Sequence, residues 1–286
     1  MQMKKYLLAL IAATAILFAS CNKKQTPTND IIVSPDENLV TLTFTPYNME
    51  PIRGDRGIEV VNRLDLWITE GDNVWDYHQV KNETNNFGTF YIALNRTKTY
   101  TIYAVGHKAE GAASLTDGII SWPDDKVTHA MFYTTTFTPA NTTTLDCQMQ
   151  RIVGMFKFTI TDDLPGEVDH MQFNISESGT RFNTATMEAM NKIERVVIPG
   201  SMNPNNVGDY VFNIYIMSDD MDNITDVDIT VQAIDENEGI VEQRSFEEVP
   251  IKNGWVTSYT GEFFVSSQVT INFTVGDWSS FDDHPY

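Results

Sequence analysis

Residues 39–45 read Leu-Val-Thr-Leu-Thr-Phe-Thr, an alternation of Val40, Leu42 and Phe44 with threonines that gives the first indication of the fold class. A period of two places every second side chain on one face of an extended chain, so the segment predicts a half-buried strand. Similar segments, rich in aromatic and β-branched residues, recur along the chain between turns. They are residues 60–69, 87–94, 99–106, 130–137, 143–149, 151–161, 168–176, 194–198, 209–217, 227–234, 240–246, 255–264 and 268–275.

The spacing of these segments indicates the fold class. Each half of the chain holds about seven short strands, which is typical of a β-sandwich. The split between the halves falls near Gln150. We therefore predict an all-β protein with two tandem β-sandwich domains, residues 38–150 and 151–286. Only residues 183–190 (NTATMEAM) and 111–116 read as short helical turns.

The first strand of the second half, RIVGMFKFTIT, carries a packing expectation. Ile152 and Met155 are expected to pack inside the second sandwich. Phe156 and Phe158 share one strand face, so loss of either ring would be costly if that face is buried. Gly154 is expected to mark a bulge or a close approach of another backbone.

The N-terminus reads as an export signal. Residues 3–22 (MKKYLLALIAATAILFASCN) combine two lysines, an apolar run too short for a bilayer core of about 30 Å, and small residues before Cys21. The end of this signal resembles a bacterial lipobox, which implies cleavage before Cys21 and a lipid on its thiol. The alternative is an ordinary cleaved signal with a cysteine there by chance. Residues 1–20 are thus predicted as signal peptide and polar residues 21–37 as a flexible linker.

Composition restricts the partners. The net charge is −20, and it becomes −22 once residues 1–20, with their two lysines, are removed. Such a polyanion is repelled by nucleic acid and by anionic headgroups, so nucleic-acid binding is not expected. The chain has two cysteines. With Cys21 acylated, Cys147 has no intrachain partner, and we expect it to be buried and inert.

Signals for chemistry are few. The five histidines are scattered, and the sequence has no HExxH, GxSxG, P-loop or CxxC motif, so we predict no enzyme and no cofactor. The acidic residues between 219 and 228 could hold calcium, but they lack the glycine and glutamate of an EF-hand loop. A solvated turn is the favoured interpretation, with no metal site. Arg53-Gly54-Asp55 spells an integrin tripeptide, but matches of this length occur by chance.

Two tryptophans are weak candidates for stacking on sugar rings. Trp75 and Trp122 lie beside Asn, Asp and Pro and are expected to be exposed, whereas Trp67 and Trp255 lie in apolar strands and are expected in the core. Taken alone, the residues predict a binding or structural module.

Three stretches together resemble a known family. Residues 61–77 (VNRLDLWITEGDNVWDY) with 90–107 (FYIALNRTKTYTIYAVGH) resemble the first domain of Bacteroidales fimbrial proteins. Residues 145–158 resemble the entry to their second domain, and residues 253–264, with Trp278, resemble their closing strands. The chain is thereby similar to the anchor and accessory lipoprotein branch of the fimbrillin superfamily. The resemblance implies two transthyretin-like sandwiches, assembly by β-strand exchange with other fimbrial subunits, and no enzymatic activity.

The resemblance also implies a place in the fimbria. Stalk subunits of the superfamily are cleaved after an arginine that follows their first strand. Arg53 and Arg56 lie in such a loop here and are candidate cleavage sites. Residues 276–286 are too polar for a donor strand, which favours an anchor or accessory subunit held at the outer membrane by lipid on Cys21. Whether it faces the surface or the periplasm stays open. The alternative is a surface glycan-binding lipoprotein of a polysaccharide-uptake system.

Overall fold

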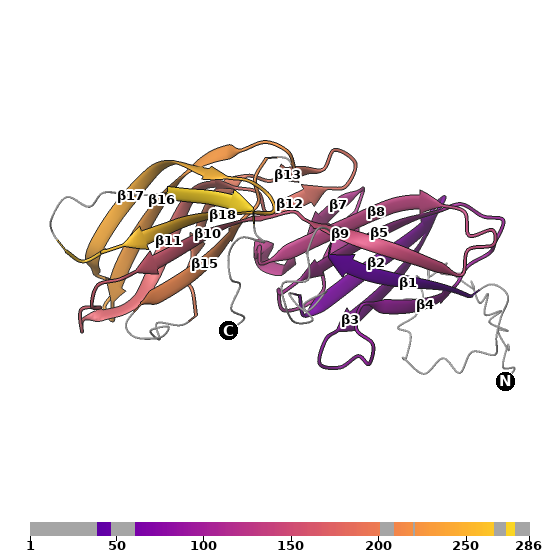
Figure 1. The fold of residues 1–286 in the computed structure, drawn as a ribbon, viewed down its shortest axis with the longest axis horizontal. Helices are drawn as coiled ribbons and strands as arrows, with labels where there is room; N and C mark the ends of the chain where they lie inside the picture. The colour runs from indigo at the N-terminus through magenta and orange to yellow at the C-terminus, as the bar shows by residue number, and fades with distance from the viewer. Residues whose placement is uncertain (1–38, 47–60, 201–208, 220, 266–272, 278–286) are drawn as a thin grey trace, which may run out of the picture.

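The computed structural model describes residues 39–46, 61–200, 209–219, 221–265 and 273–277. Within these ranges the chain is built of strands, and the single helical element is the 3₁₀ turn η2 (Pro123–Asp125). The predicted all-β fold with tandem sandwiches is confirmed, and Figure 1 shows the two halves as neighbouring lobes. Among the described residues, no helix has the length and apolar character needed to span a membrane.

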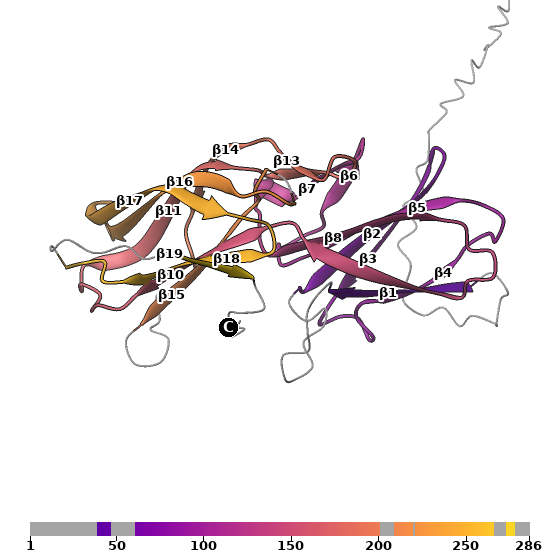
Figure 2. The ribbon, with the colours of Figure 1, turned by 45° about the horizontal axis from the view of Figure 1, so that its top comes forward.

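The first lobe is a seven-stranded sheet in the order β3-β2-β5-β8-β9-β1-β4. Only two residue pairs join β8 to β9, and the sheet folds over at this junction into two layers (Figure 2). All neighbours in this sheet are antiparallel, except that β1 runs parallel to β9. The bounds are β1 (Leu39–Pro46), β2 (Arg63–Glu70), β3 (Asn73–Val80), β4 (Thr89–Ala93), β5 (Tyr100–His107), β8 (Ala130–Phe137) and β9 (Thr144–Arg151).

The core of this lobe lies between the two layers. The predicted alternation in β1 is confirmed, because Val40, Leu42 and Phe44 are buried while Thr41 and Thr43 are half-buried. Their neighbours in the core come from the facing layer and from β4 and β9. They include Leu64, Leu66, Ile68, Phe90, Ile92, Ile102, Met131, Cys147 and Met149.

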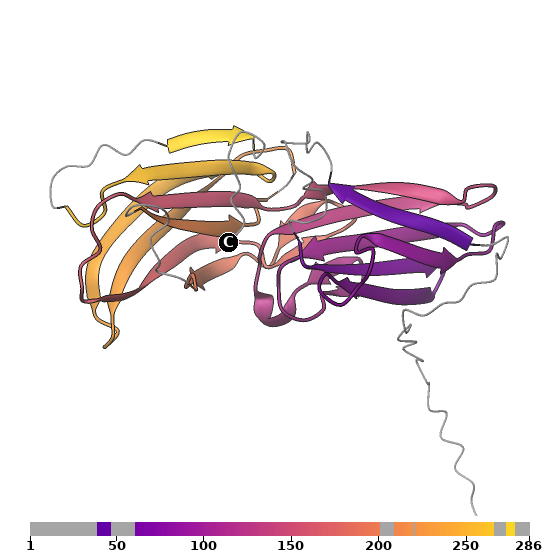
Figure 3. The ribbon, with the colours of Figure 1, turned by 60° about the horizontal axis from the view of Figure 1, so that its bottom comes forward.

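The second lobe is a sandwich of two four-stranded sheets, β15-β10-β18-β19 and β14-β11-β16-β17. In Figure 3 β19, in yellow, is the edge strand of the first of these sheets. The aromatic core between the sheets includes Phe156, Phe158, Phe173, Phe246, Tyr259 and Phe263. The bounds are β10 (Gly154–Ile160), β11 (Val168–Ser178), β14 (Ile193–Val197), β15 (Tyr210–Ile216), β16 (Thr225–Asp235), β17 (Ile240–Ile251), β18 (Trp255–Gly261) and β19 (Phe273–Asp277).

The packing expected around strand β10 is only partly confirmed. Phe156 and Phe158 are fully buried and do face the second core. Met155 is also buried, but it packs on the opposite face with Val256, because consecutive strand residues point to opposite sides. Ile152 precedes the strand and joins the cluster between the lobes instead. The close approach expected at Gly154 is confirmed, since a Cβ there would lie 2.6 Å from the carbonyl oxygen of Lys252.

A small third sheet joins the halves of the chain. It pairs β6 (Ser114–Thr116) and β7 (Ile119–Ser121) with β12 (Arg181–Asn183) and β13 (Glu188–Met190) in the order β13-β12-β7-β6. The predicted helical turns at 183–190 and 111–116 are therefore wrong. The first segment belongs to the β12–β13 hairpin and the second contains β6, and both are held by cross-strand pairing.

This small sheet covers a third hydrophobic cluster between the lobes. The cluster takes residues from both halves, with Phe182 of β12 packed edge-on against Phe132 of β8 at a ring-centroid distance of 5.1 Å. Trp67, Ile152 and Met217 are buried in the same cluster. The domain boundary between residues 150 and 151 remains a prediction. The cluster itself contains residues from both sides of that position.

Candidate strand-exchange site

Strand β1 is the first candidate site, because it lies inside its layer. It pairs antiparallel with β4 from Leu39–Ala93 to Thr43–Thr89, and parallel with β9 from Thr41–Thr144 to Pro46–Met149. Figure 3 shows β1, in indigo, in the front layer of the first lobe. Removing β1 would leave the facing backbone edges of β4 and β9 without their partner.

The inward face of β1 fits its position closely. The Phe44 ring packs edge-on against Phe90 at 5.7 Å and against Tyr133 at 6.1 Å between ring centroids. Any strand that replaced β1 would have to supply apolar side chains at alternate positions to refill this space.

A buried thiol lies beside β1. Cys147 of β9 is the register partner of Phe44 and is fully buried, as expected. Burial raises the pKa of the Cys147 thiol to about 12, and burial likewise raises the pKa of the neighbouring Tyr133 hydroxyl to about 12. The thiol is therefore protonated and unreactive near neutral pH while β1 is in place.

The lipidation and cleavage candidates lie outside the described residues. Cys21 precedes β1, and Arg53 and Arg56 follow it between Pro46 and Val61. Lipidation of Cys21 and cleavage at Arg53 or Arg56 remain predictions. Trp278 and the polar end of the chain lie beyond the described residues as well.

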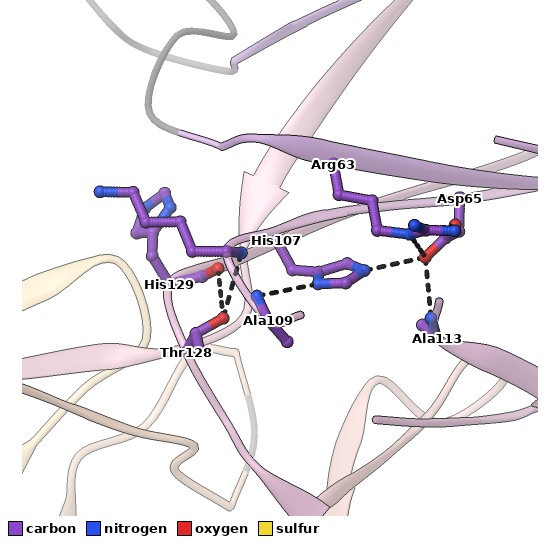
Figure 4. A network of polar contacts seen from close by, with 8 residues as sticks. Arg63, Asp65, His107, Ala109, Ala113, Thr128 and His129 are labelled. Carbon is purple, nitrogen blue, oxygen red and sulfur yellow. Dashed lines mark hydrogen bonds and ion pairs between the residues drawn. The ribbon is translucent and has the colours of Figure 1, made fainter. Parts of the chain in front are cut away.

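A buried polar network forms a second cluster, at the end of the first lobe that faces the small sheet. Figure 4 shows the Asp65 carboxylate at its centre. It accepts hydrogen bonds from Arg63 Nε at 2.9 Å, from His107 Nε2 at 2.8 Å and from the Ala113 backbone N–H at 2.8 Å. The Asp65 and His107 side chains are 2% and 0% exposed.

The bonds of His107 define its role. Its Nδ1 accepts the backbone N–H of Ala109 at 3.2 Å, so its Nε2 carries the proton donated to Asp65. Both ring nitrogens are occupied by structural partners. The network thus fixes the chain after β5 against β2, and it is a structural clamp rather than an acid–base pair open to substrate.

Sequence reasoning did not identify this network. Asp65 and His107 are 42 residues apart and match no catalytic or metal spacing. A usable signal was present, because an Asp inside an otherwise apolar strand has to find a buried partner.

The tryptophans separate into two environments. Trp75, on the edge strand β3, is 38% exposed as expected. The expected exposure of Trp122 is wrong: its ring is 4% exposed and packs in the cluster between the lobes, where it cannot stack on a sugar. Trp67 is in the core as expected, and Trp255 is only half-buried beside Lys252.

The acidic residues between 219 and 228 divide between the connection that follows β15 and strand β16 itself. Asp219, in the connection, pairs with Lys192 at 2.5 Å, whereas Asp228, within β16, accepts the backbone N–H of Glu248. In the part of the chain that the structure describes, no cluster of three or more His, Cys, Asp or Glu is placed to hold a metal ion.

Comparisons with solved structures show where else this fold occurs. A candidate polysaccharide-binding protein from Bacteroides thetaiotaomicron aligns with a TM-score of 0.51 at 11% identity, over 85% of this chain and 97% of that one. A candidate adhesin from Bacteroides ovatus aligns with a TM-score of 0.50 at 14% identity, over 84% of this chain and 94% of that one.

A fimbrial protein aligns less well. The fimbrial anchor protein Mfa2 from Porphyromonas gingivalis gives a TM-score of 0.41 at 10% identity, over 84% of this chain and 97% of that one, which is too low to support an argument. No protein-family model and no curated protein matches the sequence. The chain thus shares its two-lobed β fold with Bacteroides proteins that are candidate adhesins and polysaccharide binders.

Proposed function

We propose that this protein is a non-enzymatic, lipid-anchored adhesion or fimbrial accessory subunit that binds other subunits by strand pairing at the position of β1. The observation that carries the proposal is the place of β1 between β4 and β9, with hydrogen-bonded neighbours on both sides. A donor strand with the same alternation would recover both ladders and refill the pockets of Val40, Leu42 and Phe44.

The sequence around β1 supports the same proposal. The lipobox-like Cys21 lies upstream and would hold the protein at the outer membrane. Arg53 and Arg56 follow β1, and cleavage at either would release β1 from the rest of the chain. Without cleavage, a partner strand would pair with a free sheet edge, and the protein would be an uncut anchor.

The shared fold is consistent with this role, since the candidate adhesin from Bacteroides ovatus has the same two-lobed architecture. We propose further that the protein binds other fimbrial subunits, that it is attached to the outer membrane, and that it belongs to the fimbrial anchor branch.

The experiment compares free protein with protein recovered from fimbriae. N-terminal sequencing gives Cys21 for an uncut anchor, and Gly54 or Gly57 for maturation by cleavage. The Cys147 thiol adds a second readout, because Cys21, the only other cysteine in the sequence, would be acylated and would not react with a thiol reagent. Maleimide should label Cys147 in the cleaved chain before a donor strand enters, and should fail to label it when β1 or a donor strand is in place.

The proposal fails if the protein is absent from every fimbrial preparation. Retention of that protein on a polysaccharide column would then favour the glycan-binding alternative. If the N-terminus is uncut and Cys147 is protected from maleimide, strand replacement at β1 is rejected. Pairing at a free sheet edge would then be the remaining mode of binding.

A further inference from the structure

The outer face of one sheet in the second lobe carries a regular block of uncharged polar side chains. Three neighbouring strands, β11, β16 and β17, contribute two residues each. Their registers place them in two cross-strand rows. One row is Gln172, Gln232 and Gln243, and the other is Asn174, Thr230 and Ser245. We call these six residues the amide face.

Hydrogen bonds fix the amide face. Gln232 is its centre, since its Oε1 accepts from Gln172 at 3.0 Å and from Asn174 at 2.9 Å, and its Nε2 donates to Gln243 at 2.6 Å. Gln172 also donates to Asn174 at 3.0 Å. Because the side chains already hold one another in place, a ligand would bind them with little further loss of rotamer freedom.

The hydroxyls complete the second row. Thr230 and Ser245 share a hydrogen bond of 3.0 Å between their side-chain oxygens. All six residues are half-buried or exposed, so the face is accessible. At ordinary strand spacing, the two rows cover roughly 10 Å by 7 Å.

The amide face retains hydrogen-bonding capacity toward solvent. Each amide has two N–H donors and an oxygen with two lone pairs, so the four bonds above use at most four of the eight N–H hydrogens. On the neighbouring edge strand, Val196 pairs in register with Asn174 and is 57% exposed. The face therefore offers donors and acceptors beside an apolar contact.

Charge decides between the classes of occupant. The chain carries −20, whereas all six residues of the amide face are uncharged. Nucleic acid, acidic polysaccharides and a second copy of this chain would meet long-range repulsion. An apolar helix or strand would leave the amide groups unpaired. A neutral, hydroxyl-rich chain meets neither penalty. We therefore infer that the amide face is a binding site for neutral polysaccharide.

This inference does not rest on strand exchange, because the amide face lies on a different lobe from β1. It also moves the candidate sugar contact away from Trp75 and Trp122. Trp75 lies on β3 of the first lobe, and Trp122 is buried.

Affinity electrophoresis tests the inference with the full-length protein purified from the envelope. Native gels would contain dextran, mannan or starch as neutral probes, with heparin as the acidic probe. We expect at least one neutral probe to slow the protein and heparin to leave its mobility unchanged.

Two variants and a control locate the binding. Gln232→Ala removes three of the amide–amide bonds, and Gln243→Ala removes one from an exposed position. Each should weaken neutral-polysaccharide binding, by at least tenfold for Gln232→Ala. The matched control is Gln148→Ala, an exposed glutamine on β9 of the first lobe, which should bind like the parent. Gln243→Ala keeps the test valid if Gln232→Ala unfolds.

Several results would overturn the inference. No retardation by any neutral probe would do so, as would retardation by heparin alone. Equal retardation of the parent, Gln232→Ala and Gln243→Ala would place the sugar elsewhere. Concentration-dependent dimerisation that is lost in Gln243→Ala would assign the face to a second copy of the chain.

Discussion

At the residue scale, two charged side chains that the fold buries, Asp65 and Arg195, are each held by several partners. Asp65 receives hydrogen bonds from a guanidinium, an imidazole and a backbone amide. Arg195 is 9% exposed and donates to Ser178, to the Tyr215 carbonyl and to the Val127 carbonyl. Its burial lowers the pKa of the guanidinium to about 10. Such groups stabilise only while their partners remain.

Removing Asp65 should therefore be costly. Asp65→Ala leaves His107 Nε2 and the Ala113 N–H buried without an acceptor, and we expect a loss of about 3–5 kcal/mol in the free energy of unfolding. Urea denaturation measures it. The control is Glu70→Ala, which breaks the exposed pair with Lys98 and should leave the urea midpoint almost unchanged. Equal effects of the two substitutions would contradict the structural role of the network.

The raised pKa values of Cys147 and Tyr133 predict that the protein becomes less stable at alkaline pH. Burial raises both pKa values to about 12, whereas in the unfolded chain the thiol and the phenol have pKa values of about 8.5 and 10. The folded state thus binds more protons between these values. The contribution of these two groups to the free energy of unfolding is fully present below about pH 8.5 and is lost as the pH rises toward 12.

Urea midpoints at pH 8, 10 and 11 measure this loss. We expect a decrease over that series for the parent and a flatter profile for Cys147→Ala, in which the contribution of the thiol is absent. Parallel profiles would mean that the thiol does not contribute to the pH dependence.

At the element scale, β10 illustrates how one strand can serve two neighbours. It pairs antiparallel with β15 and parallel with β18, and both of its faces are buried. Its first residue, Gly154, lies against the backbone of the chain entering β18. A Cβ at this position would be 2.6 Å from Lys252 O and 2.8 Å from Ile251 Cγ2.

Gly154→Ala should therefore destabilise the second lobe. The new methyl group forces the backbone apart, and we expect a cost of roughly 1–3 kcal/mol, measured as a fall in the thermal midpoint. Gly166→Ala is the matched control, because nothing lies within 4 Å of the added Cβ. If both variants melt alike, the close approach at Gly154 does not constrain the fold.

At the scale of the whole molecule, the two lobes share a packed interface. The small sheet takes two strands from each half, and the cluster beneath it contains residues of both. Polar contacts cross it as well: Arg195 reaches the Val127 carbonyl, and the His129 ring lies edge-on to Tyr215 at 5.7 Å. These contacts favour one cooperative unit over two freely moving domains.

We therefore expect one unfolding transition for the parent. Phe182→Ala removes a fully buried ring from the shared cluster, at about 3–5 kcal/mol, and should separate the melting of the two lobes. Phe173→Ala, in the core of the second lobe alone, should lower stability but keep one transition, because the shared cluster is intact. Calorimetry distinguishes the two variants by the number of transitions, and two transitions in the parent would contradict the coupling.

Local patterns in the sequence were enough to predict the fold class and most of the strands. The alternation in 39–45 and 130–137 is local, and burial of one strand face follows from it directly. Cys147 was expected to be buried because it has no intrachain partner, and it is. Phe156 and Phe158 were expected to share one strand face, and that face is buried. Strand β3 was missed because, as an edge strand, it is mostly exposed and shows no apolar period.

Which distant segments pair with one another could be seen only in the folded protein. Residues 183–190 have a local pattern that fits a helical turn, but the small sheet holds them because β12 pairs with β7 from the other half. The same holds for the insertion of β1 between β9 and β4, the partners of Asp65, and the registers that assemble the amide face. Strand pairing satisfies backbone groups with any chain that the topology brings alongside, so a local pattern specifies a strand but not its neighbour.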